Sequence, residues 1–129
     1  MDSDLPFYFD WLSIMKVLTE AGIDLERRDD MGNTMFSIAI WDHRYEVVDL
    51  LLRMGGNKDI RDVWDWTPLH CAVIVNDSRI VQLLIEHGVA LNLATCSGVT
   101  PLSFALDKHQ DEIAALLIKY GAQHNKPDQ

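Results

Sequence analysis

The chain has few cysteines, and this shortage excludes the disulfide-rich class of small secreted proteins. Its two cysteines, Cys71 and Cys96, cannot form the framework of several bridges that stabilises such domains. We expect both thiols to be free, which fits a reducing compartment. The chain also has no apolar run near the ~20 residues of a membrane-spanning helix, and its first residues lack the features of a signal peptide. We therefore expect a cytoplasmic protein with no membrane partner.

Basic residues are also scarce, with 11 Lys and Arg against 20 Asp and Glu and a formal net charge of −9. Nucleic-acid binding depends on Lys and Arg that neutralise phosphates, so no nucleic-acid partner is expected. A basic protein surface is the complementary partner, and opposite charge would mainly raise the association rate. The alternative is that the acidity serves only to keep the protein soluble.

Signatures of catalysis and metal binding are missing from the sequence. No glycine-rich phosphate loop and no Gly-x-Ser-x-Gly elbow occurs. No two of the five histidines are four residues apart, and the two cysteines are far from the close spacing of zinc ligands. The adjacent carboxylates Asp29-Asp30 and Asp111-Glu112 favour solvent-facing positions, because an acid–base pair needs two different environments around one cleft. We expect no catalytic residue, no metal and no cofactor.

What the sequence does contain is a period of 33 residues that several residue types share. Such a period indicates one structural unit stacked along an axis, and stacked units build surfaces that bind other molecules. The residues in register are Thr34, Thr67 and Thr100; Ala39, Ala72 and Ala105; Leu51, Leu84 and Leu117; and Gly22, Gly55, Gly88 and Gly121.

The repeated motif points to a known family. Residues 67–72 read Thr-Pro-Leu-His-Cys-Ala and residues 100–105 read Thr-Pro-Leu-Ser-Phe-Ala, each followed by an aliphatic run and a glycine. This pattern resembles the ankyrin repeat. The resemblance implies an all-α solenoid of helix-turn-helix units with β-turn fingers. It also implies that His70 ties the threonine hydroxyl to the neighbouring backbone.

Within each unit, local signals predict where the helices begin and end. Thr67 should cap the first helix and Pro68 should be its first residue, while Gly88 should end the second helix in the left-handed conformation. Gly32 and Gly98 supply a positive φ in their fingers, and Asp65 takes that position in the third repeat. Second helices are predicted near 45–53, 79–86 and 112–119, with a further helix at 10–20.

The period divides the chain into one repeat domain over residues 1–125 and a disordered tail over 126–129. The expected units are a partial capping repeat at 10–28 and full repeats at 29–61, 62–94 and 95–125. The aromatic segment 5–9 either substitutes for a missing first helix or forms a partner-binding arm. Polar residues at 108–112 and Lys119 are expected to cap the other end.

Finger tips and the outer ends of the first helices are not needed for stacking, so their residues carry information about binding. Three of the four tryptophans, Trp41, Trp64 and Trp66, occupy such positions, and tryptophan is enriched among interface hot spots. Alternatively, Trp64 or Trp66 folds back onto its own finger or packs against Trp41. The predicted partner-binding residues are Asp30, Met31, Asn33, Trp41, Asp42, Val63, Trp64, Asp65, Trp66, Ile74, Val75, Ser97, Val99 and Asp107.

Three functions are compatible with these observations. The first is a non-enzymatic, monomeric module that binds another protein through its finger and first-helix face. The second is a stand-alone inhibitor or immunity-type protein that blocks an enzyme or toxin. The third, an enzyme or small-ligand-binding domain, would require a deep cavity near Trp41 and Trp64.

Overall fold

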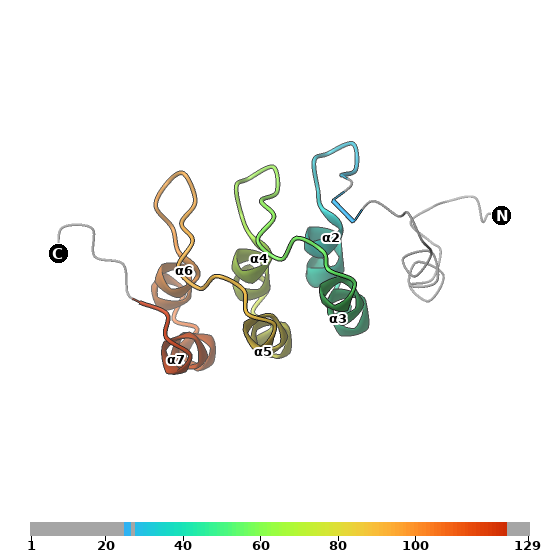
Figure 1. Cartoon of the computed structure of the whole chain (residues 1–129). Helices are drawn as coiled ribbons and strands as arrows, with labels where there is room; N and C mark the ends of the chain where they lie inside the picture. Colours follow the sequence, from blue (N-terminus) through green and yellow to red (C-terminus); the bar gives the residue numbers. More distant parts are fainter. Residues whose placement is uncertain (1–24, 27, 124–129) are drawn as a thin grey trace.

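The computed structural model describes residues 25–26 and 28–123, and over these residues it is an all-α solenoid. Three helical hairpins stand side by side, each with a projecting finger; the first helices form one row and the second helices another (Figure 1). The predicted segments 5–9, 10–20 and 126–129 lie outside the described residues. The helices are α2 (Met35–Trp41), α3 (Tyr45–Arg53), α4 (Pro68–Ile74), α5 (Ser78–Glu86), α6 (Pro101–Asp107) and α7 (Asp111–Lys119).

Each first helix begins where the sequence predicts. The side chains of Thr34, Thr67 and Thr100 each accept a hydrogen bond from the backbone N–H three residues later. Pro68 and Pro101 stand at the first helical position, where the missing N–H leaves no bond unmade. The predicted bounds of the second helices are confirmed to within one residue.

The turns place residues in the left-handed region at fixed register positions. Gly88 has φ 82° and ends α5 as predicted. The fingers use Gly32 and Gly98, both with φ 85°, and Asp65 with φ 69°, so the prediction for Asp65 is confirmed. Asp62 fixes its finger, because its Oδ1 accepts hydrogen bonds from two finger N–H groups.

The core lies between successive repeats. Ala39, Ala72 and Ala105 are fully buried, which allows the first helices to approach closely. The aliphatic residues of the second helices fill the remaining space, and burial of such surface stabilises the stack by about 25 cal/mol per Å². The leucines in register, Leu51, Leu84 and Leu117, are also fully buried.

His70 links the third repeat to the fourth, and this confirms the role that the family resemblance implied. Its Nδ1 accepts a hydrogen bond from the Thr67 backbone N–H at 3.2 Å and lies 2.8 Å from the Thr67 hydroxyl. The proton is therefore on Nε2, which donates to the Val99 carbonyl 2.8 Å away in the next finger. Burial lowers the pKa of His70, so the neutral ring is the favoured form.

Candidate functional site

Trp41, Trp64 and Trp66 form one aromatic cluster, which we call the Trp cluster. The ring centroids of Trp41 and Trp64 are 5.7 Å apart with an interplanar angle of 59°, and those of Trp64 and Trp66 are 5.6 Å apart at 33°. Trp41, at the end of α2, and Trp66, at the base of the finger before α4, are half-buried against the core. Trp64 remains 53% exposed between them. The expected alternative, packing against Trp41, is thus observed together with an accessible indole.

Two further apolar side chains lie on the neighbouring finger tips. Met31 is 72% exposed and Val63 is 57% exposed. The second and third fingers touch here, since a Cβ at Gly32 would lie 3.0 Å from the Cβ of Val63. The exposed apolar side chains of adjacent fingers therefore face solvent close to the Trp cluster.

Asp42 and Asp65, two of the predicted partner-binding residues, each lie beside an arginine. Asp42, beside Trp41, accepts a hydrogen bond from Arg44 at 2.6 Å. Asp65 lies 3.4 Å from Arg61 and also accepts the Cys96 backbone N–H at 2.7 Å. The negative charge of these two aspartates is therefore partly neutralised, because arginines that repeat register does not reveal lie next to them.

The other predicted residues are spread along the same face. Asp30, Ser97 and Asp107 are exposed, and Asp107 lies 4.0 Å from Lys108. Ile74, Val75 and Val99 are half-buried, as is Asn33, whose amide nitrogen donates to Asp29. Ile74 and Val75 stand at the end of α4, and the carbonyls of Asn33 and Val99 accept backbone hydrogen bonds within their fingers. These four residues therefore contribute to the fold as well as to the surface.

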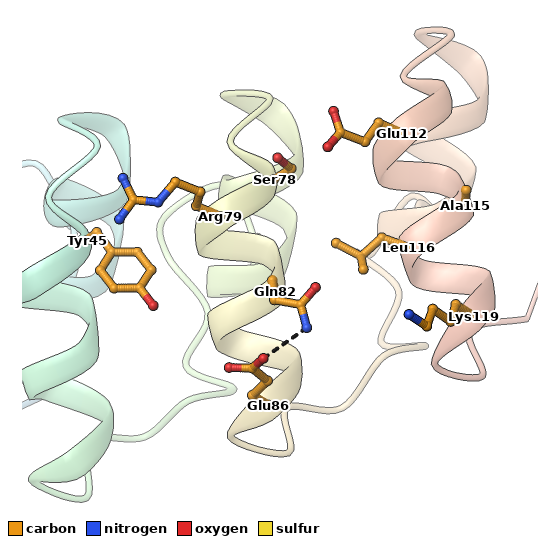
Figure 2. Close-up of a pocket in the computed structure, with 9 residues that line it drawn as sticks. All are labelled: Tyr45, Ser78, Arg79, Gln82, Glu86, Glu112, Ala115, Leu116 and Lys119. Atoms are coloured by element: carbon orange, nitrogen blue, oxygen red, sulfur yellow. Dashed lines mark hydrogen bonds between the residues drawn. The ribbon is translucent and has the colours of Figure 1, made fainter.

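A feature that the sequence did not predict is a hollow of about 500 Å³ on the second-helix row (Figure 2). It lies mainly between α5 and α7, with Tyr45 of α3 at one edge, and none of the tryptophans lines it. Its lining residues are Tyr45, Ser78, Arg79, Gln82, Glu86, Glu112, Ala115, Leu116 and Lys119.

The hollow arises from a break in the repeat pattern. Between α3 and α5, the guanidinium carbon of Arg79 lies 4.4 Å from the centre of the Tyr45 ring, and this pair forms one edge of the hollow. One repeat later the residues in register are Glu112 and Ser78, which cannot form this contact. A cross-repeat comparison of these positions could have found the hollow from the sequence.

The two free cysteines differ in burial. Cys71 is buried, and burial raises the pKa of its thiol far above the ordinary value, with nearby Asp62 adding to the shift. Cys96 is exposed on the fourth finger. Within the described part of the chain, no group of three His, Cys, Asp or Glu side chains is arranged to hold a metal ion, and no helix is long and apolar enough to cross a membrane.

Known proteins share both the repeats and part of the sequence. A stretch of 55 residues, 43% of this chain, is 38% identical to RelA-associated inhibitor from Mus musculus. The matched region is 7% of that protein's length. A family model described as ankyrin repeats, in 3 copies, matches residues 45–128, more than half of the chain. Together with the threonine caps, the fingers and the stacked hairpins, this match shows that the chain belongs to the ankyrin-repeat family.

Proposed function

We propose that this protein binds a partner protein through its finger face, with Trp64 at the centre of the contact. The observation that carries the proposal is the combination of a half-exposed indole with two supporting indoles, whose centroids lie 5.7 and 5.6 Å away. Tryptophan is one of the residue types most enriched among interface hot spots. The exposed side chains of Met31 and Val63 extend the apolar area onto the finger tips.

The partner is expected to be a protein that presents an apolar centre with some basic charge around it. Interfaces of this type have an apolar core and a polar rim. The net charge of −9 favours a basic partner, although Arg44 and Arg61 reduce the local acidity near Asp42 and Asp65. Two free thiols fit a cytoplasmic location.

A pull-down from native lysate tests the proposal with the full chain as bait. Trp64→Ser should lose a partner that the original chain retains, with affinity reduced by about 2 kcal/mol or more. Ala115→Ser is the matched control, because Ala115 is exposed on the opposite, second-helix row. Capture of the same proteins by all three baits would contradict the proposal.

Trp64 is the variant of choice because its neighbours also support the fold. Trp41 and Trp66 pack against the core, so their replacement by Ala should lower stability as well as binding. Trp64→Ser should leave the melting temperature within a few degrees of the original value, since Trp64 is 53% exposed.

Inhibition of the partner is a second candidate function. The relative with 38% identity over 55 residues bears the name of an inhibitor, and this is the observation that favours it. A captured enzyme would be assayed with the original chain and with Trp64→Ser. Inhibition by the first and not by the second supports an inhibitor, whereas unchanged activity with both supports a scaffold.

A further inference from the structure

The indole N–H groups of the Trp cluster are unpaired donors. Among the described residues, none of the three indoles has a hydrogen-bond acceptor, although a buried indole N–H usually finds one. Asn33 Oδ1 and Gln110 Oε1 are the buried side-chain atoms without a partner in this part of the chain, so the N–H groups of Trp41 and Trp66 reach the surface. Trp64 between them is 53% exposed. The cluster therefore presents hydrogen-bond donors together with aromatic rings.

The backbone of the third finger, in contrast, has most of its donors engaged. The N–H of Asp62 donates to the Trp66 carbonyl, and the N–H of Asp65 donates to the Asp62 carbonyl, both at 2.9 Å. The N–H groups of Trp64 and Trp66 donate to Asp62 Oδ1 at 2.9 and 3.0 Å. A partner strand needs free backbone donors along the edge that it joins. This finger is therefore unsuited to strand addition, and the indoles are its donors toward a ligand.

A ligand that matches this surface supplies carbonyl acceptors and apolar groups that pack on aromatic rings. A proline-rich segment in the polyproline II conformation does both, because its carbonyls make no internal hydrogen bonds and its prolines have no N–H. Such segments bind other proteins by docking between aromatic side chains. A partner helix uses its backbone carbonyls internally, so it would leave the indole donors unpaired unless its side chains supplied acceptors.

We propose that the Trp cluster binds an extended, proline-rich segment of the partner protein, whose backbone carbonyls accept hydrogen bonds from the indoles. This inference rests on the proposed function and names the kind of segment that the finger face recognises. The tilt between neighbouring rings, 59° and 33°, means that neither pair forms a parallel stack. The pyrrolidine rings of the segment pack against the exposed part of these indoles.

A basic residue beside the prolines fits the charge of the neighbouring finger tip. Asp30, on the second finger, is exposed and has no ion pair among the described residues. Asp42 and Asp65, by contrast, each lie beside an arginine. The net charge of −9 acts in the same direction and favours the approach of a cationic segment.

Heteronuclear NMR of the nitrogen-labelled full chain tests the proposal, because each indole N–H gives its own cross-peak. The probes are proline-rich peptides of about ten residues, roughly three turns of polyproline II helix, with an arginine at either end. Control peptides of the same length and charge carry alanine in place of proline. The proline-rich peptides should shift the indole cross-peaks of the Trp cluster, and the alanine peptides should bind at least about tenfold more weakly, because they lack the preformed conformation.

Trp64→Phe separates the hydrogen bond from the ring. This variant keeps an aromatic side chain and removes the N–H donor, so its affinity for the peptide should fall about threefold to tenfold. Trp64→Ser removes both and should weaken binding at least about tenfold. Ala115→Ser, on the second-helix row, is the matched control and should bind like the original chain. Circular dichroism of each variant establishes that the helices are retained.

Asp30→Asn tests the contribution of charge. It should weaken the binding of a peptide that carries arginine at the favoured end, and it should leave the binding of a peptide without arginine unchanged. Equal weakening of both peptides would show that Asp30 does not recognise the basic residue.

Three results would overturn the proposal. They are indole cross-peaks that no proline-rich peptide shifts, equal binding of the proline and alanine peptides, and undiminished binding by Trp64→Ser. Undiminished binding by Trp64→Phe would exclude the indole hydrogen bond. The pull-down keeps the two proposals apart: a lysate partner that is lost with Trp64→Ser, together with failure of every peptide, leaves the binding function in place and overturns only the proline-rich segment.

Discussion

At the scale of single residues, the turn between the two helices of each repeat places one residue in the left-handed region. A contact with the next repeat can compensate the energetic cost of this backbone conformation. His43, Asn76 and His109 stand at the same register position with φ 57°, 59° and 59°. Residues with a Cβ are disfavoured in the left-handed region, whereas glycine is not. His43 is compensated by a contact of 2.7 Å between its Nδ1 and Asp77 Oδ2 in the next repeat.

Glycine substitution at the two histidines should therefore have different effects. We expect His109→Gly to raise the free energy of unfolding by about 0.5 kcal/mol, because relief of the left-handed backbone outweighs the extra entropy of the unfolded chain. His43→Gly should give no gain, because it loses the contact with Asp77. Urea unfolding of both variants measures the difference. Equal gains would show that the His43–Asp77 contact contributes nothing.

At the scale of elements, α4 is tied to the next finger through one buried imidazole. His70 bridges Thr67 at the start of α4 and the Val99 carbonyl. Burial is the largest cause of its lowered pKa; the Val99 hydrogen bond opposes the shift, Arg61 adds to it, and Asp65 and Asp62 oppose it. The link therefore depends on a neutral ring.

Acidification should weaken this link. Because the pKa of folded His70 lies below the ordinary 6.5, the unfolded chain binds more protons as the pH falls below that value. Stability is then full above about pH 6.5 and falls below it, until the lowered pKa of the folded state is reached.

Urea unfolding at about pH 7.5 and about pH 5.5 measures this effect, since the two conditions bracket the ordinary pKa of imidazole. The original chain should lose more stability on acidification than His70→Gln does. His109→Gln, at an exposed histidine, should behave like the original chain. The same loss of stability in the His70→Gln variant would assign the pH dependence to other groups.

The hollow between α5 and α7 shows how the contact between two helices differs where the repeat pattern changes. Gln82 reaches across the hollow to the Tyr120 hydroxyl at 3.1 Å and along its own helix to Glu86 at 2.9 Å. The contact between Arg79 and Tyr45, which links α3 to α5, has no counterpart between α5 and α7, where Glu112 and Ser78 stand in register. The second-helix row is therefore more open at its carboxyl-terminal end (Figure 2).

At the scale of the whole molecule, each repeat contacts only its neighbours, so stability should vary along the stack. α4 and α5 are packed on both sides, by α2 and α3 and by α6 and α7. α6 and α7 have a described neighbour on one side only, with Leu106 and Ile118 left exposed.

Amide hydrogen exchange at low protein concentration should reflect this gradient. Protection should be greatest in α4 and α5 and lower in α6 and α7, because the end repeat opens locally at smaller free energy. Equal protection in all these helices would show that the stack unfolds as one unit.

The sequence by itself determined the period, the threonine caps, the bounds of the second helices and the left-handed positions such as Asp65. These features depend on residues within a few positions of one another, where capping, proline geometry and glycine freedom act locally. The predicted helix at 10–20 and the tail at 126–129 lie outside the described part of the chain, so both remain predictions. The division of the chain at residue 125 also remains a prediction, because residues 124–129 are not described.

Only the tertiary structure decided what the surface of the stack presents. It left Trp64 accessible while it half-buried Trp41 and Trp66, and it set Arg44 and Arg61 beside the aspartates. It also exposed Leu106 and Ile118, whose type alone favours burial. The physical reason is that these outcomes depend on which side chains stand about one repeat away, and the period constrains stacking residues but leaves those on the surface free to vary.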